Sequence, residues 1–285
     1  MPCKFLEKKL DALETCGVEG GITNETAQFG DSFIKIYGNE LLPNPYLRFY
    51  RELVALDVMK DTSVTVPKII SIDISNSSFP RLQISSIPGQ TLHSIALSDP
   101  NQCSPLIQKA GEVMANIHQQ KSQINPKEYF RYFVQRLDTI LLRVSSILAS
   151  QEIESVKVKS FLESKLDENK LLASGVSQLH GDFWFNNILC DKGEISGIID
   201  WEMASRGFSY QDIATFSIDM EEESNLQVDF SNFWGGYNQS VDPDLKKAFV
   251  VAQCILFLDN AKITDFDSVE DSFYKKLTRI IKKHV

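Results

Sequence analysis

The chain has 285 residues, of which 43% are hydrophobic and 24% are charged, and this composition is typical of a globular protein rather than a disordered one. Its length is comfortable for two lobes. The formal net charge of −9 argues against general nucleic-acid binding, which depends on clustered lysine and arginine. The acidic balance weakly favours a cationic small molecule as a partner, or it only confers solubility.

The first part of the chain is expected to alternate short strands with turns. A helix is predicted over 5–16, and a glycine-rich turn, GVEGGITNET, follows at 17–26. The run SFIKIY at 32–37 is typical of a strand, because β-branched and aromatic residues dominate it. Apolar residues at helical spacing predict a helix at about 46–59, and two short strands follow, the second at 81–84.

The turn-forming residues SSIPG at 85–89 separate this part from a mostly helical remainder. We therefore place a first lobe at 1–86 and a second at 87–285. Long helices are predicted at about 127–149 and 151–167, and further helices run from about 209 to the end. The predicted fold class is α+β, with a small β-rich N-terminal lobe and a larger, mainly helical C-terminal lobe.

Three features bear on the compartment of the protein. Its 5 cysteines are scattered and form no C-x-x-C pair, which argues against a disulfide framework or a zinc site. The first residues lack the apolar core of a signal peptide, and the longest apolar run, at 249–258, is too short to span a bilayer. We expect a cytoplasmic protein without a membrane partner. No pattern indicates an oligomeric state.

The strongest motif in the chain is HGDFWFNNIL at 180–189, which is followed by GIIDWE at 197–202. The pattern between the two segments predicts a β-hairpin that turns at 191–193. In such a hairpin Asn187 and Asp200 meet at the open end. The motif therefore predicts two oxygen-bearing side chains brought together from two strands.

These side chains suit phosphoryl transfer, a reaction that needs positioning and charge neutralisation more than covalent help. The amide oxygen of Asn187 and the carboxylate of Asp200 suit Mg²⁺, which prefers hard oxygen ligands. Asp182 lies in the loop that leads into the same end, where it could orient an attacking hydroxyl and accept its proton. Each residue alone could merely cap a turn, but their predicted convergence favours the catalytic role.

The motif resembles the catalytic signature of the aminoglycoside phosphotransferase and choline kinase superfamily, H-G-D-x-x-x-x-N followed by a short hairpin and I-I-D. The resemblance extends in order over nearly the whole chain. It implies a two-lobed protein-kinase-like fold and ATP- and Mg²⁺-dependent transfer of the γ-phosphate to a hydroxyl group of a small molecule. By it, Asp182 is the catalytic base, and Asn187 and Asp200 are the metal ligands. His180 then braces the catalytic loop, and Asp212 is structural.

The same resemblance implies that the first lobe binds the nucleotide. Lys35 in the predicted strand would neutralise the α- and β-phosphates, and Glu52 on the next helix would pair with it. There are two alternatives: Lys35 extends to the surface, or Glu52 pairs with Arg48 one helical turn away.

Two further segments are expected to contact the nucleotide. The glycine-rich turn resembles the GGxTN loop of choline-kinase-like members, and glycines permit close backbone approach to phosphates. The segment LQISSIPGQTL at 82–92 resembles the linker between lobes, whose backbone would hold the adenine edge. The nucleotide-contacting residues predicted in this way are Ile22, Thr23, Asn24, Ser85 and Ile87.

The acceptor is expected to bind in the helical lobe, where aromatic rings and carboxylates would suit a quaternary ammonium through cation–π attraction. The candidate acceptor-binding residues are Trp184, Trp201, Glu202 and Trp234. The segment at 200–216 also resembles choline and ethanolamine kinases, and the first expectation is therefore a cationic alcohol of that kind. An aminoglycoside, thiamine or a sugar-type alcohol fits the same catalytic residues, and these aromatic residues could instead belong to the core.

The sequence also bears on two other classes of function. A nucleotide-binding pseudokinase scaffold would share the fold, but no expected catalytic residue is missing. A protein kinase is disfavoured because the chain has no activation segment ending in A-P-E. The sequence thus favours a small-molecule kinase, whose partners are ATP, Mg²⁺ and a hydroxyl-bearing substrate.

Overall fold

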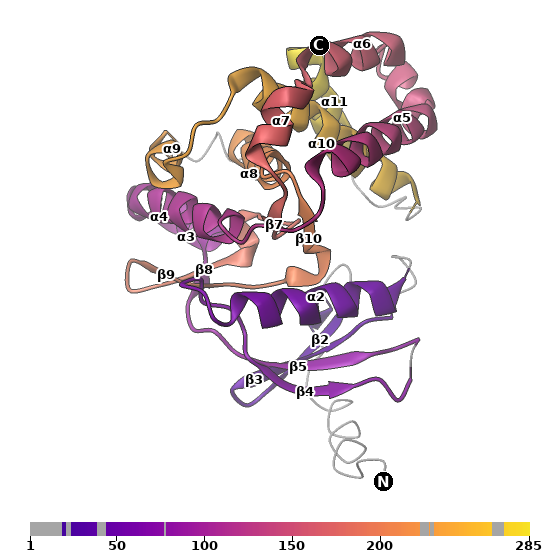
Figure 1. Cartoon of the computed structure of the whole chain (residues 1–285). Helices are drawn as coiled ribbons and strands as arrows, with labels where there is room; N and C mark the ends of the chain where they lie inside the picture. The colour runs from indigo at the N-terminus through magenta and orange to yellow at the C-terminus, as the bar shows by residue number, and fades with distance from the viewer. Residues whose placement is uncertain are drawn as a thin grey trace.

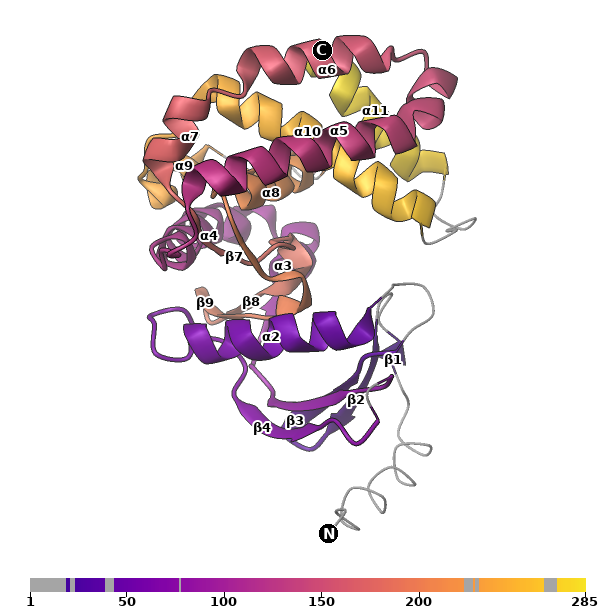
Figure 2. The same cartoon turned by 45° about the vertical axis from the view of Figure 1, so that its right-hand side comes forward.

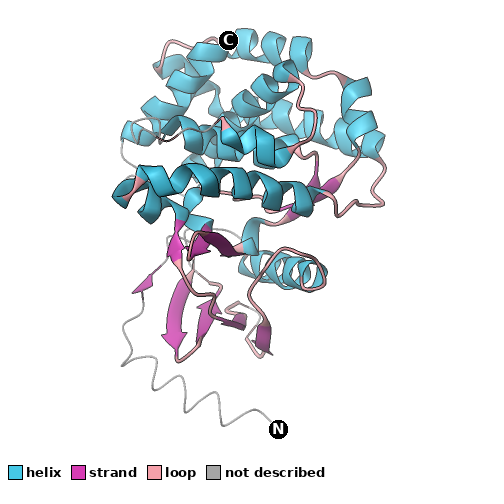
Figure 3. Cartoon of the chain, turned by 90° about the vertical axis from the view of Figure 1, so that its left-hand side faces the viewer, coloured by secondary structure: helices cyan, strands magenta, loops and turns pink. Residues whose placement is uncertain are grey.

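The computed structural model describes residues 19–20, 24–38, 44–76, 78–222, 228, 231–263 and 271–285. These residues form two lobes, a small N-terminal sheet with one long helix and a larger helical lobe (Figure 1). Colouring by secondary structure shows most helices gathered in the second lobe, with strands in the first lobe and at the junction (Figure 3). The predicted two-lobed fold is therefore confirmed.

The sheet of the first lobe is antiparallel and has the strand order β1-β2-β3-β5-β4. The central strand β3 carries Lys35 among apolar side chains. Its register places Lys35 between Thr26 of β2 and Leu82 of β5. Its strands are β1 (Glu19–Gly20), β2 (Glu25–Phe29), β3 (Ser32–Ile36), β4 (Ile69–Asp73) and β5 (Arg81–Ser85).

Helix α2 (Pro45–Met59) lies between this sheet and the helical lobe (Figure 2). Proline at its first position fits a helix start, where the missing N–H has no intrahelical partner to lose. Its buried face combines Phe49, Leu56 and Met59 with two charged residues, Arg48 and Glu52. Buried charged side chains need polar partners, so we expect these two residues to be paired with groups at or near the lobe junction.

The connection between lobes is anchored to the second lobe immediately after β5. Strand β6 (Gln90–Thr91) pairs with β8 (Ile188–Asp191), and the Ser196 hydroxyl donates to the Pro88 carbonyl at 2.5 Å. Gly89 has φ of +126°, and a Cβ there would meet the Cys190 carbonyl oxygen at 2.3 Å. Only glycine fits this close approach, which holds the linker against the hairpin.

The second lobe packs its helices around two apolar cores. The long predicted helix near 127–149 is confirmed, whereas the helix predicted at 151–167 begins later, because Glu152 adopts a left-handed conformation with φ of 56°. No helix among the described residues is both long and apolar enough to cross a bilayer. The helices are α3 (Leu92–Ser98), α4 (Pro100–His118), α5 (Pro126–Ser150), α6 (Ser155–Lys165), α7 (Glu168–Ser174), α8 (Tyr210–Glu222), α9 (Asn232–Tyr237), α10 (Pro243–Ile263) and α11 (Asp271–His284).

A short β region lies where the two lobes meet. The predicted hairpin is formed by β8 and β9 (Glu194–Ile198), and Lys192 and Gly193 both have positive φ, as a two-residue primed turn requires. It is flanked by the 3-10 turns η1 (Phe185–Asn187) and η2 (Trp201–Met203). Strands β7 (Ser177–Leu179) and β10 (Ser205–Gly207) pair beside it.

Candidate active site

The open end of the hairpin carries the residues of the strongest sequence motif. The Ile199 N–H donates to the Asn187 carbonyl at 3.0 Å, so Asn187 and Asp200 lie side by side, as the pattern predicted. The Asn187 amide nitrogen donates to the backbone carbonyl of Asp182 at 2.8 Å and to its Oδ2 at 3.1 Å. Both of these bonds use the amide nitrogen of Asn187 and tie its side chain to Asp182.

Asp182 has the environment of a base that works near neutral pH. Burial, and after it the nearby Asp200 carboxylate, raises the pKa of Asp182 to about 7. The indole N–H of Trp184 donates to Oδ1, which orients the carboxylate. A carboxylate with this pKa can accept a proton from a hydroxyl at physiological pH far better than an ordinary aspartate.

The raised pKa has a consequence for stability. Between pH about 4 and 7 the folded metal-free protein binds more protons at Asp182 than the unfolded chain, whose aspartate has a pKa of 3.8. The free energy of unfolding therefore falls as the pH rises through this window. We expect Asp182→Asn to remove this contribution and to raise the Tm at pH 8 in EDTA. Thermal melting of both proteins at pH 5 and pH 8 measures the effect, and parallel pH dependence would contradict it.

The catalytic loop is braced by buried polar groups. Asp212 accepts the backbone N–H groups of His180 and Gly181, both at 2.8 Å. Burial lowers the pKa of His180, which keeps the ring neutral. Its Nε2–H then donates to the Ile199 carbonyl at 2.9 Å, while Nδ1 accepts the Asp182 N–H at 3.3 Å. His180 and Asp212 thus hold the loop and the hairpin together.

Lys35 links the first lobe to this site. Its Nζ lies 2.6 Å from Glu52 Oε2 and 2.7 Å from Asp200 Oδ1, and the Tyr37 hydroxyl also donates to Glu52. Burial lowers the pKa of Lys35, but the Asp200 and Glu52 carboxylates outweigh it and raise that pKa well above its ordinary value. The lysine is therefore charged, and the predicted Lys35–Glu52 pair is formed in the buried junction rather than at the surface.

Lys35 also changes the pKa of Asp200. Burial would raise the pKa of Asp200, but the Lys35 ammonium prevails and the pKa is lowered. The carboxylate is therefore ionised. Its oxygen lies within 4.8 Å of carboxylate oxygens from Glu52 and Glu202, and these three groups form a cluster that could hold a metal ion.

The predicted nucleotide-contacting residues have different positions. Ile22 and Thr23 lie outside the described residues. Asn24 is buried, and its side chain contacts Arg48 and Glu202. The Ser85 N–H donates to the Lys68 carbonyl at 2.9 Å, and this backbone donor is therefore already engaged.

Ile87 lies over the hairpin, where a Cβ on Gly197 would meet its Cδ1 at 2.6 Å. The linker residue is therefore in direct contact with the strand that leads to Asp200. An adenine held by the linker would lie close to the hairpin, as the predicted arrangement requires.

The predicted acceptor-binding residues do not gather around one cavity. Trp184 is half-buried beside Asp182, and its ring centroid lies 5.3 Å from that of Phe257. Trp201 is fully buried, with its ring 4.5 Å from His180 and its N–H bonded to the Ile198 carbonyl. Trp201 therefore packs in the core and presents no surface to a substrate.

The other two acceptor candidates already have partners. The Glu202 carboxylate pairs with Arg48 at 3.3 Å and is 3% exposed. The Lys246 ammonium lies 4.0 Å from the ring centroid of Trp234, where it covers one aromatic face. Of the four predicted residues, Trp184 is thus the one in contact with Asp182.

Arg48 is the polar residue of the site whose role sequence reasoning missed. Helical spacing indicates it only as an alternative partner of Glu52. In the structure its guanidinium contacts Asn24 and Glu202, which are 24 and 154 residues away in sequence. Its position on the buried face of α2, one turn before Glu52, was the available signal.

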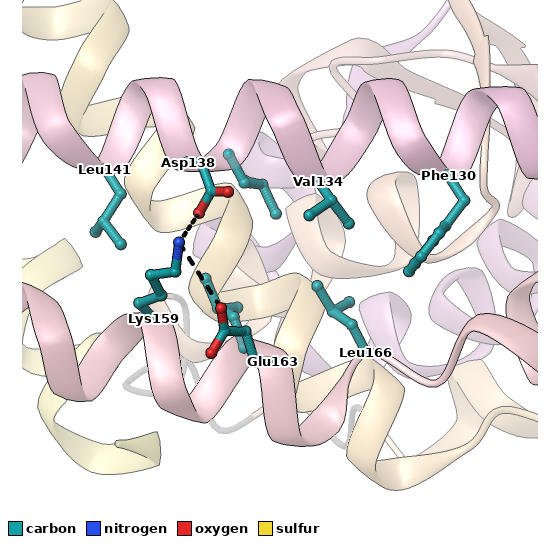
Figure 4. Close-up of a pocket in the computed structure, with 9 residues that line it drawn as sticks. Phe130, Val134, Asp138, Leu141, Lys159, Glu163 and Leu166 are labelled. Atoms are coloured by element: carbon teal, nitrogen blue, oxygen red, sulfur yellow. Dashed lines mark hydrogen bonds and ion pairs between the residues drawn. The ribbon is translucent and has the colours of Figure 1, made fainter.

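A separate apolar groove of about 200 Å³ lies between α5 and α6 (Figure 4). Phe130, Val134 and Leu166 line it, and Lys159 bridges Asp138 and Glu163 at its rim. None of the predicted site residues lines it. The groove is therefore separate from the residues that the sequence motif brings together at the lobe junction.

Comparisons with known proteins identify the family and the fold of this chain. A family model described as "Phosphotransferase enzyme family" matches residues 15–244. A homoserine kinase from Neisseria meningitidis serogroup B (strain ATCC BAA-335 / MC58) is 26% identical over 264 residues, which covers 85% of this chain and 80% of the relative.

Solved structures similar to this chain share its fold at low sequence identity. A thermostable mutant of the aminoglycoside phosphotransferase APH(4)-Ia has a TM-score of 0.65 and 17% identity, with 98% of each chain covered. The macrolide 2'-phosphotransferase MphH from Brachybacterium faecium has a TM-score of 0.62 and 16% identity, with 95% of this chain and 97% of that one covered.

Proposed function

Since this chain belongs to the phosphotransferase enzyme family, we propose that it transfers the γ-phosphate of ATP, with Mg²⁺, to a hydroxyl group of a small molecule. The observation that carries the proposal is the convergence of Asp182, Asn187 and Asp200 at one end of the hairpin, next to the Lys35–Glu52 pair. Positioning and charge neutralisation are the main requirements of phosphoryl transfer, and these residues provide both.

Asp182 acts as the base in this proposal. Its carboxylate is held by Trp184 and Asn187, and its pKa of about 7 lets it take the proton of the acceptor hydroxyl as the oxygen attacks the phosphorus. Lys35 neutralises the phosphates, and Glu52 keeps it in place when a nucleotide competes for its charge.

The donor set beside Asp182 fits Mg²⁺. Asn187 offers an amide oxygen, and Asp200 offers an ionised carboxylate whose side chain is 34% exposed. Both are hard oxygen ligands, and such a site leaves room for water and phosphate oxygens. When bound, the metal would neutralise charge on the phosphates. Asn187 lies directly before β8 and Asp200 lies shortly after β9, so the hairpin formed by these strands positions both residues.

A cationic amino alcohol of the choline or ethanolamine type is the first acceptor candidate. Trp184 supports it, because the half-buried ring lies directly beside the catalytic Asp182 and could face an ammonium group. The net charge of −9 supports it through long-range attraction.

A hydroxylated amino acid is the second candidate, and two observations favour it. One is the similarity to the Neisseria homoserine kinase. The other is a pair of arginines from different lobes, Arg51 of α2 and Arg136 of α5. Burial, and after it the Arg136 guanidinium, lowers the pKa of Arg51, so the two charges lie close enough to repel. A carboxylate between them would relieve the repulsion.

An ADP-release assay with matched acceptors separates the two candidates. Homoserine and 3-aminopropan-1-ol differ only by the carboxylate. Turnover of homoserine alone supports the amino-acid acceptor, whereas turnover of 3-aminopropan-1-ol, ethanolamine or choline supports the cationic alcohol. The panel should include thiamine, aminoglycosides and simple sugars. If ATP binds but no acceptor in the whole panel is phosphorylated, the proposed function is wrong.

Arg136→Gln gives a second test of the amino-acid acceptor. We expect KM for homoserine to rise about tenfold, a loss of ~1.4 kcal/mol, with little change in kcat, because the arginine would hold a group remote from the reacting atoms. Arg131→Gln, which removes an exposed arginine from the same helix, is the matched control and should leave KM unchanged. Equal effects of both substitutions would argue against the arginine pair.

A further inference from the structure

Three buried polar side chains meet where the two lobes join, and none of them reacts in the proposed mechanism. Asn24 precedes β2, Arg48 lies on α2, and Glu202 belongs to η2; each is 3% exposed. Arg48 NH1 donates to Asn24 Oδ1 at 2.9 Å and to Glu202 Oε2 at 3.3 Å, and the Asn24 amide also donates to Glu202. The three groups form a closed hydrogen-bonded triangle.

Forming such a triangle costs free energy of desolvation and requires all three side chains to adopt specific orientations. Buried charges lose their hydration, and a buried pair adds little net stability even when well formed. Removing one member leaves the others buried and unpaired, which costs more than the pair contributed. A cluster of this kind is therefore better explained by the conformation that it specifies than by the stability that it adds.

The triangle is connected to Asp200 by two residues of chain. Asp200 has a left-handed conformation with φ of 63°, and the 3-10 turn η2 begins directly after it. Trp201 then packs into the helical lobe against His180, while the next residue, Glu202, faces Arg48 of the N-terminal lobe. Successive side chains thus anchor the turn to opposite lobes, and they fix the backbone of Asp200 from both sides.

The triangle is also connected to the nucleotide side of the junction. Asn24 immediately precedes β2, and Glu52 follows Arg48 by one helical turn on the same face of α2. One face of α2 therefore holds Lys35 through Glu52 and holds Glu202 through Arg48.

We propose that Asn24, Arg48 and Glu202 form an interlobe latch, a set of positioning residues that places Asp200 in register with the start of β2. The inference rests on the proposed function, since it takes Asp200 as a metal ligand. The polar groups of the latch bond to one another, and the proposal gives them no direct part in the transfer step. It acts through the backbone of Asp200 on one side and through the start of β2 on the other.

Binding of AMP-PNP by calorimetry, with and without Mg²⁺, tests the latch independently of any acceptor. We expect Arg48→Gln and Glu202→Gln each to reduce the gain in affinity that Mg²⁺ confers by about tenfold. The double variant should lose no more than either single one, because both substitutions break the same unit. Arg48→Lys keeps the charge but not the planar guanidinium, and it should recover only part of the gain.

Two further variants separate the latch from a loss of folding. Asn24→Ala removes the smallest member, and we expect the same reduction of the affinity gain that Mg²⁺ confers. This variant keeps the test possible if the larger substitutions unfold the protein. Arg143→Gln breaks an ion pair with Asp259 in the helical lobe, and it should lower the Tm without changing the gain.

The alternative outcomes are distinct. If Glu202→Gln alone reduces the gain and Arg48→Gln and Asn24→Ala do not, Glu202 binds the metal directly and the latch is overturned. Additive losses in the double variant would also overturn it. If the wild-type protein gains no affinity from Mg²⁺, the proposed metal site fails rather than the latch.

Discussion

Asp182→Asn is expected to lower kcat by about 10²–10⁴-fold, the range that a positioned general base contributes. Asparagine keeps the size of the side chain and can still accept the Trp184 N–H, but it cannot take the proton of the acceptor hydroxyl. Binding of ATP and Mg²⁺ should be nearly unchanged, because the proposed metal ligands are Asn187 and Asp200. Steady-state kinetics with the acceptor found in the panel, together with calorimetry of AMP-PNP, measure both quantities.

Asp191→Asn is the matched control for this substitution. It makes the same chemical change at the turn of the same hairpin, on the side away from the reaction centre. We expect it to retain wild-type kcat. Full activity of Asp182→Asn would remove this residue as the base, and equal losses in both variants would indicate damage to the hairpin instead.

Asp200→Asn is expected to have the second largest effect, a loss of activity of about 10²–10³-fold accompanied by a loss of Mg²⁺-dependent nucleotide binding. The substitution removes the ionised ligand and also the carboxylate that lies 2.7 Å from Lys35. The lysine would then be held by Glu52 alone, at 2.6 Å, and metal-free ATP should bind at least as well as before.

Kinetics over a range of Mg²⁺ concentrations measure the effect of Asp200→Asn. Asp57→Asn, an exposed aspartate on α2, serves as the control and should behave as the wild type. An unchanged Mg²⁺ dependence in Asp200→Asn would show that the metal is held by other groups, and the assignment of this residue would then be wrong.

The parts of this site that the sequence predicted are those with a short-range signal. The turn at Lys192 and Gly193, with strands on both sides, specifies the hairpin and thereby the meeting of Asn187 and Asp200. The strand around Lys35 follows from its β-branched and aromatic neighbours. The resemblance in the catalytic motif is confirmed by the family match over residues 15–244.

The parts that could not be predicted depend on long-range packing. The left-handed conformation of Asp200 and the 3-10 turn after it decide that Trp201 enters the core while Glu202 faces α2. No periodicity in a segment of this length distinguishes those two directions. The contact of Arg48 with Glu202 spans 154 residues, and no local pattern indicates it.

The sequence carries only a weak signal for the identity of the acceptor, because this too depends on long-range packing. Aromatic and acidic residues near the motif suggested a cation-binding pocket, but packing uses Trp201 in the core and Lys246 covers one face of Trp234. The arginine pair Arg51 and Arg136 brings together residues from different lobes. The proximity of these two charges is therefore a property of the folded junction rather than of any segment.

We propose that Asp182, Asn187 and Asp200 form a phosphoryl-transfer site. Mass spectrometry of the acceptor panel after incubation with ATP, Mg²⁺ and the protein tests it most directly. We predict that one acceptor gains a single phosphoryl group with the wild-type protein and with Asp191→Asn, and that the product is nearly absent with Asp182→Asn. Equal product formation by the wild-type protein and by Asp182→Asn would contradict the account.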